Sequence, residues 1–596
     1  MKQSWLTESS DRIGISRDDD THARNALFWS ITLATVGLGL TIGFFLHGGT
    51  HGLYMDDYSE KSWAFDFVAA KWKLNLDPQF HIRSLAHIFI ANLANAIPRH
   101  EFTVRLAIVA IHFLNVFLIG KLAYRVTGSR FVAISSSASF LFPIFANEAL
   151  LWFAASIANT TSLSLLLIGF HCLLSCGSLK KNLLLLGYGV GAWILMVLFY
   201  EPGLFTLLLL PAFIGMAHYG RTRPDRRVWI VALAGAYMPI GIYLFFVERM
   251  APEVAVRGGP TLNLKFILAH RVPDAVRELI GLLTYWGLSG PLPEALALGW
   301  HEWRSVLLGW ALLGSFVIGC VLVAMMYPVK RETIPGSQRL ARLLFVALAW
   351  ILLSMVPVVL LRSQGFAIRI LYTPSAGCAL GAAAISGLIV NLFRQRREVF
   401  IRAILLMMGP VLFVCSLTMA GLVRTYQLRS YLDRRQLEAL GPVISLLPRA
   451  ETLWLLPVGL DETAVSKSWG RTGRLDEFLF GVFEISWSAR DAVRLEFGGR
   501  NVQAVTSNRW EKPHMTSVLR SQDGHITTFA MQGQAVPAHE LLAFTYQQDR
   551  LILLSPLELD SPDGHFSASV DLPLVAQLAQ TGIKVQPCHF QLERWN

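Results

Sequence analysis

Long apolar runs dominate the first 425 residues of this chain, and short polar connections separate them. A run of about 20 apolar residues is long enough to cross a bilayer as an α-helix. The pattern therefore predicts eleven membrane-spanning helices. They are expected near residues 27–46, 102–121, 131–146, 155–176, 183–199, 203–217, 228–247, 304–327, 343–361, 371–391 and 400–421.

One further segment, residues 273–290, is moderately apolar but contains Arg277 and Glu278. A twelfth crossing there would put basic loops on opposite sides of the membrane. We therefore expect an interfacial or re-entrant helix inside a long outer loop, residues 248–303.

After residue 440 the apolar runs become short and rich in β-branched and aromatic residues. Residues 480–487, 492–497 and 541–554 read as strands, with Gln548 and Asp549 at a turn. The sequence thus predicts an α-helical polytopic membrane protein of about 11 spans, followed by a β-rich soluble domain at 440–596, an antiparallel sandwich. The tryptophans Trp469, Trp487 and Trp510 would be core residues or a sugar-stacking platform.

Composition agrees with this fold class. The chain has 53% hydrophobic and 16% charged residues, whereas a soluble protein has about 25% charged residues. The net charge of +11 is read through its placement, because Lys and Arg beside spans report orientation first. A nucleic-acid partner finds no support.

Short basic connections occur between alternate pairs of predicted spans, and the positive-inside rule places them in the cytoplasm with the N-terminal tail, residues 1–26. The first loop, residues 47–101, and the C-terminal domain are then extracytoplasmic, as expected for a multi-pass protein of the plasma (inner) membrane. The basic residues are Lys121, Arg125, Arg130, Lys180, Lys181, Arg221, Arg223, Arg226, Arg227, Lys330, Arg331, Arg339, Arg342, Arg394, Arg396, Arg397 and Arg402.

A pair of carboxylates, Asp56 and Asp57, follows the first predicted span directly. Such a pair at a membrane surface suits a general base, a divalent cation or a hydrogen-bond acceptor, and its plain alternative is a solvated loop. No His or Cys spacing typical of a metal site occurs elsewhere, so Asp56 and Asp57 are the candidate ligands if a divalent cation binds.

Three stretches together resemble the GT-C superfamily of multi-span glycosyltransferases, particularly the protein O-mannosyltransferase-like branch and bacterial relatives that use polyprenyl-phosphate sugars. They are Met-Asp-Asp-Tyr at 55–58, Phe-Pro-Ile-Phe-Ala-Asn-Glu-Ala-Leu-Leu-Trp at 142–152, and Arg-Ile-Leu-Tyr-Thr-Pro-Ser-Ala-Gly at 369–377. Their order, spacing and shared outer side carry the resemblance, which covers residues 25–425. The second stretch lacks the His before Pro143 seen in some relatives, and residues 440–596 match no part of the family, so acceptor specificity does not transfer.

The resemblance implies an enzyme whose catalytic domain is residues 27–425. It would move a hexosyl or pentosyl group from a polyprenyl-phosphate donor to a hydroxyl of a glycan, lipid or protein on the outer face. Asp56 is the expected base and Asp57 the second choice.

Basic and aromatic residues in the outer segments are candidates for donor or substrate binding. An arginine presents a planar fork to phosphate oxygens, although any arginine at a helix end could instead meet lipid headgroups. Glu148 with Trp152 offers a carboxylate and an aromatic face suited to a sugar. The full set is Arg83 with His81, Arg362, Arg369, Tyr372, Asn147, Glu148 and Trp152.

The main alternative is a non-enzymatic transporter or flippase of lipid-linked sugars, and a polymerase or ligase would change only the donor. The predicted span centres are almost free of ionisable groups, which disfavours an ion-coupled transporter. The exceptions, His112 and His171, read as packing histidines. Glu201 before Pro202 reads as a structural turn at a helix start.

Overall fold

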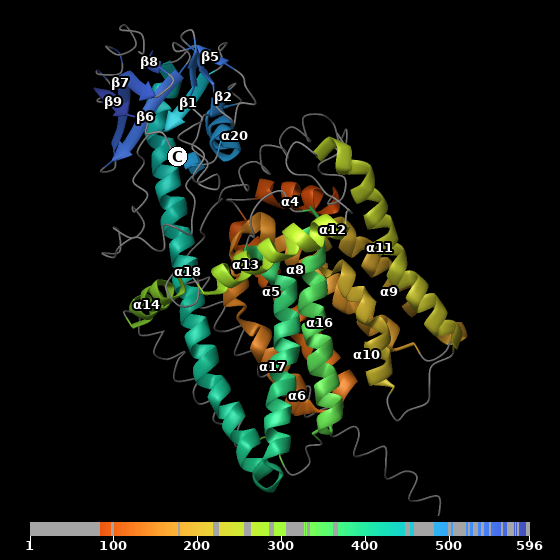
Figure 1. The fold of residues 1–596 in the computed structure, drawn as a ribbon. Coiled ribbons are helices and arrows are strands. Elements are labelled where there is room, and N and C mark those ends of the chain that lie inside the picture. Colours follow the sequence, from red (N-terminus) through yellow and green to blue (C-terminus); the bar gives the residue numbers. More distant parts are fainter. Residues whose placement is uncertain are drawn as a thin grey trace, which may run out of the picture.

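The structure is a computed structural model, and helices form most of the part that it describes (Figure 1). The described residues are 84–96, 100–176, 179–218, 226–254, 264–284, 291–304, 327, 329, 334–361, 368–446, 453–457, 482–484, 486–498, 502–504, 520–522, 525–527, 535–537, 541–547, 550–561, 564–568, 577, 580 and 583–591. The predicted first span near 27–46 and most of the eighth lie outside them.

A helical bundle forms the body of the molecule, and large aromatic side chains fill its centre. Phe170 contacts Trp193, Phe213 and Trp350 edge-on or tilted, with ring centroids 5.2–5.8 Å apart. The helices are α5 (Glu101–Thr127), α6 (Arg130–Leu141), α8 (Phe153–Leu174), α9 (Leu179–Phe199), α10 (Leu210–Ala217), α11 (Arg226–Val254), α16 (Ser337–Leu361) and α17 (Tyr372–Leu392).

Five helices in the described part are long and apolar enough to cross a membrane: Glu101–Thr127, Phe153–Leu174, Ser337–Leu360, Ile368–Leu392 and Arg394–Leu446. Three shorter apolar helices, Leu183–Phe199, Glu201–Ala217 and Trp229–Phe245, coincide with other predicted spans. The helical character of these runs is confirmed. The total of eleven crossings stays a prediction.

The predicted span at 131–146 is wrong as a single helix, because α6 ends at Leu141. The residue before a proline avoids the helical region, and Phe142, which precedes Pro143, has φ −124° and ψ 88°. Glu201 behaves as expected: it begins a 3-10 helix, η3 (Glu201–Leu209), with Pro202 in the first turn.

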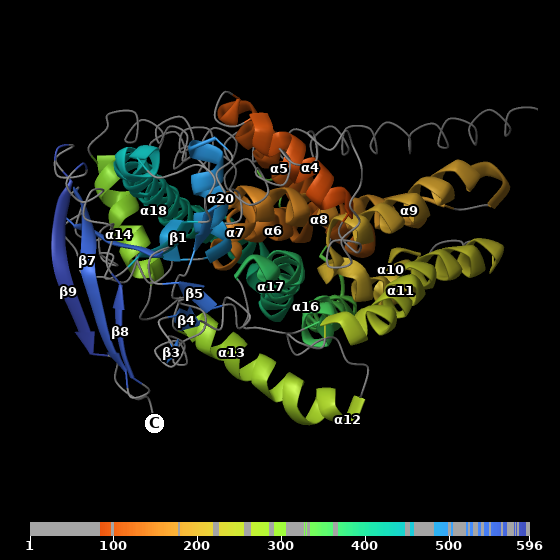
Figure 2. The same ribbon diagram turned by 90° about the horizontal axis from the view of Figure 1, so that it is seen from above.

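The segment expected to be interfacial is a continuous helical stretch made of α12 (Leu264–Phe266), η5 (Ile267–Arg271) and α13 (Val272–Thr284). Figure 2 shows it along the edge of the bundle. Arg271 Nη1 donates to the Leu360 carbonyl (2.6 Å), which ties the stretch to the end of α16. Val276 and Ile280 remain exposed on α13, so its form suits the interfacial alternative.

Helix α18 (Arg397–Leu446) has 50 residues, a length of about 75 Å, which exceeds a hydrocarbon core of about 30 Å. Helix α14 (Pro291–Arg304) crosses it in close contact. A Cβ at Gly421 would overlap the Ala295 carbonyl, and one at Gly299 would overlap the Leu417 carbonyl. Only glycine permits this approach.

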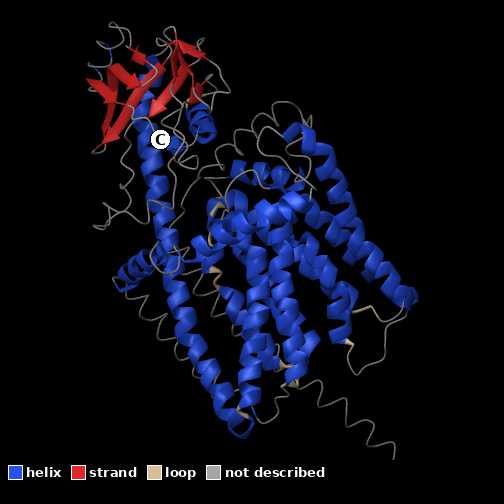
Figure 3. Cartoon of the chain, in the orientation of Figure 1, coloured by secondary structure: helices blue, strands red, loops and turns tan. Residues whose placement is uncertain are grey.

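The C-terminal residues form sheets at one end of the molecule (Figure 3). The larger sheet has the order β2-β1-β6-β7-β8, and β9 also pairs with β7. Strand β1 is parallel to β2 and β6. Strand β7 is antiparallel to β6 and β8 but parallel to β9. The strands of this sheet are β1 (Leu453–Pro457), β2 (Val502–Ala504), β6 (Leu541–Gln547), β7 (Arg550–Ser561), β8 (Gly564–Ala568) and β9 (Lys584–Gln591). A smaller antiparallel sheet contains β3 (Arg520–Gln522), β4 (His525–Thr527) and β5 (Ala535–Pro537).

The hairpin predicted at 541–554 is confirmed, with residues 548 and 549 between β6 and β7. The other two predicted strands are wrong: a 3-10 helix, η10 (Val482–Glu484), and a helix, α20 (Ser486–Glu496), take their place. Ala489, Ala492 and Val493 are buried on α20, the spacing of a helix face. The larger sheet is mixed, not antiparallel as predicted.

The end of α18 lies inside the core of this domain. Leu440 and Val443 are buried together with Phe483 and Phe544. Upstream on the same helix, Asp433 Oδ1 accepts hydrogen bonds from Arg429 Nε (3.1 Å) and from the Val482 backbone N–H (3.1 Å). One helix thus joins the bundle to the C-terminal domain without a linker.

Candidate functional site

The chain unwinds between α6 and α8, in the stretch predicted to carry site residues. A 3-10 turn, η2 (Ile144–Ala146), is followed by one helical turn, α7 (Glu148–Leu151). Trp152 is extended, with φ −82° and ψ 116°, and α8 begins at Phe153. Glu148 and Trp152 therefore project from an irregular segment at the ends of helices.

A second short element, η8 (Ile368–Leu371), packs against η2 and α7 and runs directly into α17 at Tyr372. This packing brings Arg369 to Glu148, although 221 positions separate them. Two of the stretches that carried the family resemblance thus meet in space.

Arg369, Glu148 and Trp152 form a group that we call the surface cluster. Arg369 Nη1 lies 3.4 Å from Glu148 Oε2, and the Arg369 backbone N–H donates to the same oxygen at 3.3 Å. The guanidinium carbon lies 4.4 Å from the centre of the Trp152 ring, within the range of a cation–π contact. The side chains of Arg369 and Glu148 are 28% and 13% exposed.

The ion pair in this cluster is long, since charge-assisted N–H···O bonds are about 2.7–2.9 Å. A guanidinium has five N–H donors, and Glu148 is the only acceptor that Arg369 meets with its side chain in the described part. Most of the N–H donors of Arg369 therefore have no protein acceptor among the described residues, and its guanidinium lies over the Trp152 ring.

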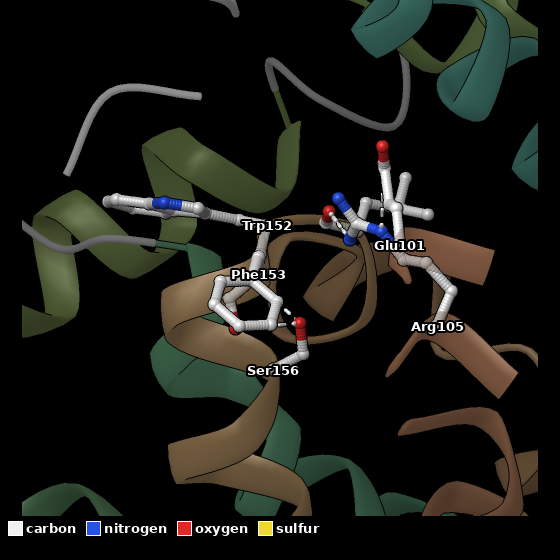
Figure 4. A network of polar contacts seen from close by, with 6 residues as sticks. Glu101, Arg105, Trp152, Phe153 and Ser156 are labelled. Carbon is white, nitrogen blue, oxygen red and sulfur yellow. Dashed lines mark hydrogen bonds and ion pairs between the residues drawn. The ribbon is translucent and has the colours of Figure 1, made fainter. Parts of the chain in front are cut away.

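A buried ion pair supports the turn that carries Trp152. Arg105 Nη1 donates to the Leu151 carbonyl (2.7 Å), and Arg105 Nε lies 3.6 Å from Glu101 Oε1. Figure 4 shows the Trp152 indole pointing away from this pair. Sequence reasoning missed both residues, although an acidic and a basic residue four positions apart at the start of an apolar helix are a usable signal.

Asn147 lies beneath Glu148 and is fully buried. Its Nδ2 donates to the Ile144 carbonyl (2.8 Å), which closes the 3-10 turn. Its Oδ1 has no hydrogen-bond partner in the described part of the chain. Asn147 thus stabilises the turn that precedes Glu148.

The side chain of Tyr372 belongs to a different set of contacts. It is fully buried, and its hydroxyl lies 2.7 Å from His112 Nδ1 and 3.2 Å from Asn115 Nδ2. His112 and His171 are both buried and hydrogen-bonded to carbonyls, which fits their reading as packing histidines, although His171 Nδ1 has no hydrogen-bond partner in the described part of the chain.

The remaining predicted site residues, Asp56, Asp57, His81, Arg83 and Arg362, lie outside the described residues. Among the residues that are described, no group of three or more His, Cys, Asp or Glu could hold a metal ion. A cation at Asp56 and Asp57 stays a prediction.

No family model and no curated protein matches the sequence. Similar solved structures include ArnT from Cupriavidus metallidurans in the apo state, with 14% identity and a TM-score of 0.29 over 77% of this chain and 88% of that chain. The same protein bound to undecaprenyl phosphate matches with 14% identity and a TM-score of 0.31 over 72% of this chain and 82% of that one. TM-scores this low assign neither a fold nor an activity to this chain.

Proposed function

We propose that this protein is an integral membrane glycosyltransferase that uses a polyprenyl-phosphate sugar as donor. The observation that carries the proposal is the contact between Arg369 and Glu148 beside Trp152. The family resemblance named these residues from separate stretches, and their meeting in space is what a shared donor site requires.

In this proposal the surface cluster binds the donor. The phosphate oxygens displace the long Glu148 contact and accept paired bonds from the Arg369 fork. Trp152 holds the guanidinium from its face, and Glu148 is then released to accept bonds from sugar hydroxyls. The partial exposure of both charged side chains leaves the phosphate a path of approach.

The cluster lies at one end of the candidate spans, next to the last turn of α16 and the first turn of α17. At the opposite end of the same helices, Arg339 donates to the Val126 and Met216 carbonyls. The basic end is cytoplasmic by the positive-inside rule, so the cluster faces outward at headgroup depth, where a membrane-resident donor can reach it.

The acceptor hydroxyl is activated by Asp56, which takes its proton as the anomeric carbon is attacked. The polyprenyl phosphate leaves with the electron pair of the broken glycosidic bond. Asp57 orients Asp56 or shares a divalent cation with it. Residues 440–596 then form an extracytoplasmic domain.

The test is a transfer assay with the purified full-length protein in lipid nanodiscs, a radiolabelled polyprenyl-phosphate sugar and a cell-envelope extract as acceptor. We expect label to move from the lipid to an acceptor, and to stop moving when Asp56→Asn replaces the wild type. Movement of intact labelled lipid between leaflets without any transfer would favour the flippase alternative and overturn the proposal.

A further inference from the structure

Below the surface cluster, the helices enclose a polar network inside the apolar bundle. It contains His112 and Asn115 from α5, Thr160 and Ser164 from α8, and Tyr372 from α17. All five residues are at most 5% exposed. We call it the buried network.

The hydrogen-bond directions in this network are fixed by two backbone carbonyls. The Leu141 carbonyl, 3.0 Å from His112 Nε2, can only accept, so the hydrogen of a neutral imidazole is on Nε2 and Nδ1 accepts from the Tyr372 hydroxyl. The Thr160 carbonyl accepts from Asn115 Nδ2 (2.9 Å), which fixes the orientation of the amide.

The remaining bonds follow from these two ends. Asn115 Nδ2 also donates to the Tyr372 oxygen, and Asn115 Oδ1 accepts from Ser164 Oγ at 2.7 Å. Tyr372 therefore donates once and accepts once, and each of its partners is held in turn by a backbone carbonyl or a second helix. The hydrogen-bond directions at the Tyr372 hydroxyl are therefore fixed, whereas Ser164 Oγ can also donate to the Thr160 carbonyl (3.0 Å).

The position of Tyr372 matters because of what precedes it. Arg369 lies three residues earlier in η8, one turn of a 3-10 helix. The network also includes bonds that join Asn115 to Thr160 and Ser164 of α8, and Trp152 directly precedes that helix. The network therefore joins α17, which follows η8 directly, to α8, which follows Trp152.

We propose that His112, Asn115 and Tyr372 are positioning residues that hold Arg369 against Glu148 and Trp152. Tyr372 acts through Arg369 and does not touch the donor. This inference rests on the proposed function only for the identity of the ligand, since the placement of Arg369 can be measured without one.

The first measurement is hydrogen exchange by mass spectrometry on the full-length protein in nanodiscs. Tyr372→Phe keeps the ring and removes the hydroxyl, and we expect faster exchange in peptides that cover 148–152 and 368–372. Trp193→Phe is the matched control, because it removes another buried bond in the bundle, from Trp193 Nε1 to the Leu166 carbonyl (3.2 Å). Equal exchange of these peptides in the two variants would overturn the inference.

The second measurement is the affinity for polyprenyl phosphate alone. We expect Tyr372→Phe to lower it about tenfold, the factor for one buried hydrogen bond, and Ser164→Ala, at the edge of the network, to lower it less. On an Arg369→Ala background, Tyr372→Phe should cause no further loss, because both act through one contact. If Tyr372→Phe lowered the affinity for polyprenyl phosphate equally in the wild type and in Arg369→Ala, Tyr372 would be a packing residue only.

The two measurements separate the claims. A wild type that binds no polyprenyl phosphate would defeat the proposed donor, and the exchange comparison would still decide whether the buried network positions Arg369.

Discussion

Arg369 of the surface cluster and Tyr372 of the buried network are three residues apart on the chain, yet their polar groups are paired in opposite ways. In the surface cluster, Arg369 meets Glu148 at 3.3–3.4 Å and both side chains remain partly exposed. In the buried network, bonds of 2.7–3.2 Å join His112 and Asn115 to Tyr372 and, at the other end, to two backbone carbonyls. Polar groups inside a membrane must be satisfied internally, whereas an incompletely paired charge is tolerated at its edge and is available to a ligand.

This contrast predicts that variants outside the network lose activity and keep the fold, and Asp56→Asn should give the largest effect. Asn keeps the size of Asp but cannot take a proton, so transfer should fall about 10²- to 10⁴-fold without a change in thermal unfolding. Asp57→Asn should be milder if Asp57 only orients the base. Full transfer activity in the variant with both substitutions would remove the carboxylate mechanism.

Asn115→Ala, by contrast, should lower the stability of the fold. It removes the Asn115 donor to the Tyr372 oxygen, while Ser164 Oγ can still donate to the Thr160 carbonyl (3.0 Å). The unsatisfied Tyr372 oxygen should cost about 1–3 kcal/mol. The matched control is Asn159→Ala, since the side chain of buried Asn159 bonds, within the described residues, only to the Ala155 carbonyl of its own helix. Thermal unfolding in nanodiscs should show the larger loss for Asn115→Ala. Similar losses would mean that the network does not stabilise the bundle.

Glu148→Gln should give the smallest effect, and it should raise the affinity for polyprenyl phosphate. It removes a carboxylate that competes with phosphate for Arg369. Because the pair is partly exposed, affinity for polyprenyl phosphate should rise only about two- to fivefold, while sugar transfer falls. Glu302→Gln is the control, since Glu302 pairs with Arg424 at the same 3.4 Å. Weaker binding of polyprenyl phosphate to Glu148→Gln would contradict the competition.

Sequence reasoning predicted the helical runs because long apolar segments leave few alternatives in a membrane. It failed at 131–146, where hydropathy continues through Pro143 but the backbone cannot. It also failed at 480–487 and 492–497, where runs rich in β-branched and aromatic residues read as strands although Ala489, Ala492 and Val493 have helical spacing. In both places a local backbone signal was present and was outweighed by the hydrophobic pattern.

For the site, the resemblance selected Glu148, Trp152 and Arg369, and the structure brings these three together. The resemblance could not show that Arg369 belongs to the partly exposed cluster and Tyr372 to the buried network, because their spacing of three residues does not reveal which side chain is buried. Tyr372 is held inside the bundle by His112, which lies 260 positions away along the chain. No local sequence pattern encodes this packing. Asp56 and Asp57 lie outside the described residues, so their role stays a prediction.

The central claim is that Arg369 in the surface cluster binds the donor phosphate. The most direct measurement compares the affinity of Arg369→Ala and Arg424→Ala for polyprenyl phosphate in nanodiscs. Both variants remove an arginine paired with a glutamate at 3.4 Å, but only Arg369 stacks on Trp152 and lies beside the unwound turn. Loss of a charge-assisted contact of about 2 kcal/mol predicts a weakening of about 30-fold for Arg369→Ala, with Arg424→Ala close to the wild type. Equal affinities in the two variants would contradict the claim.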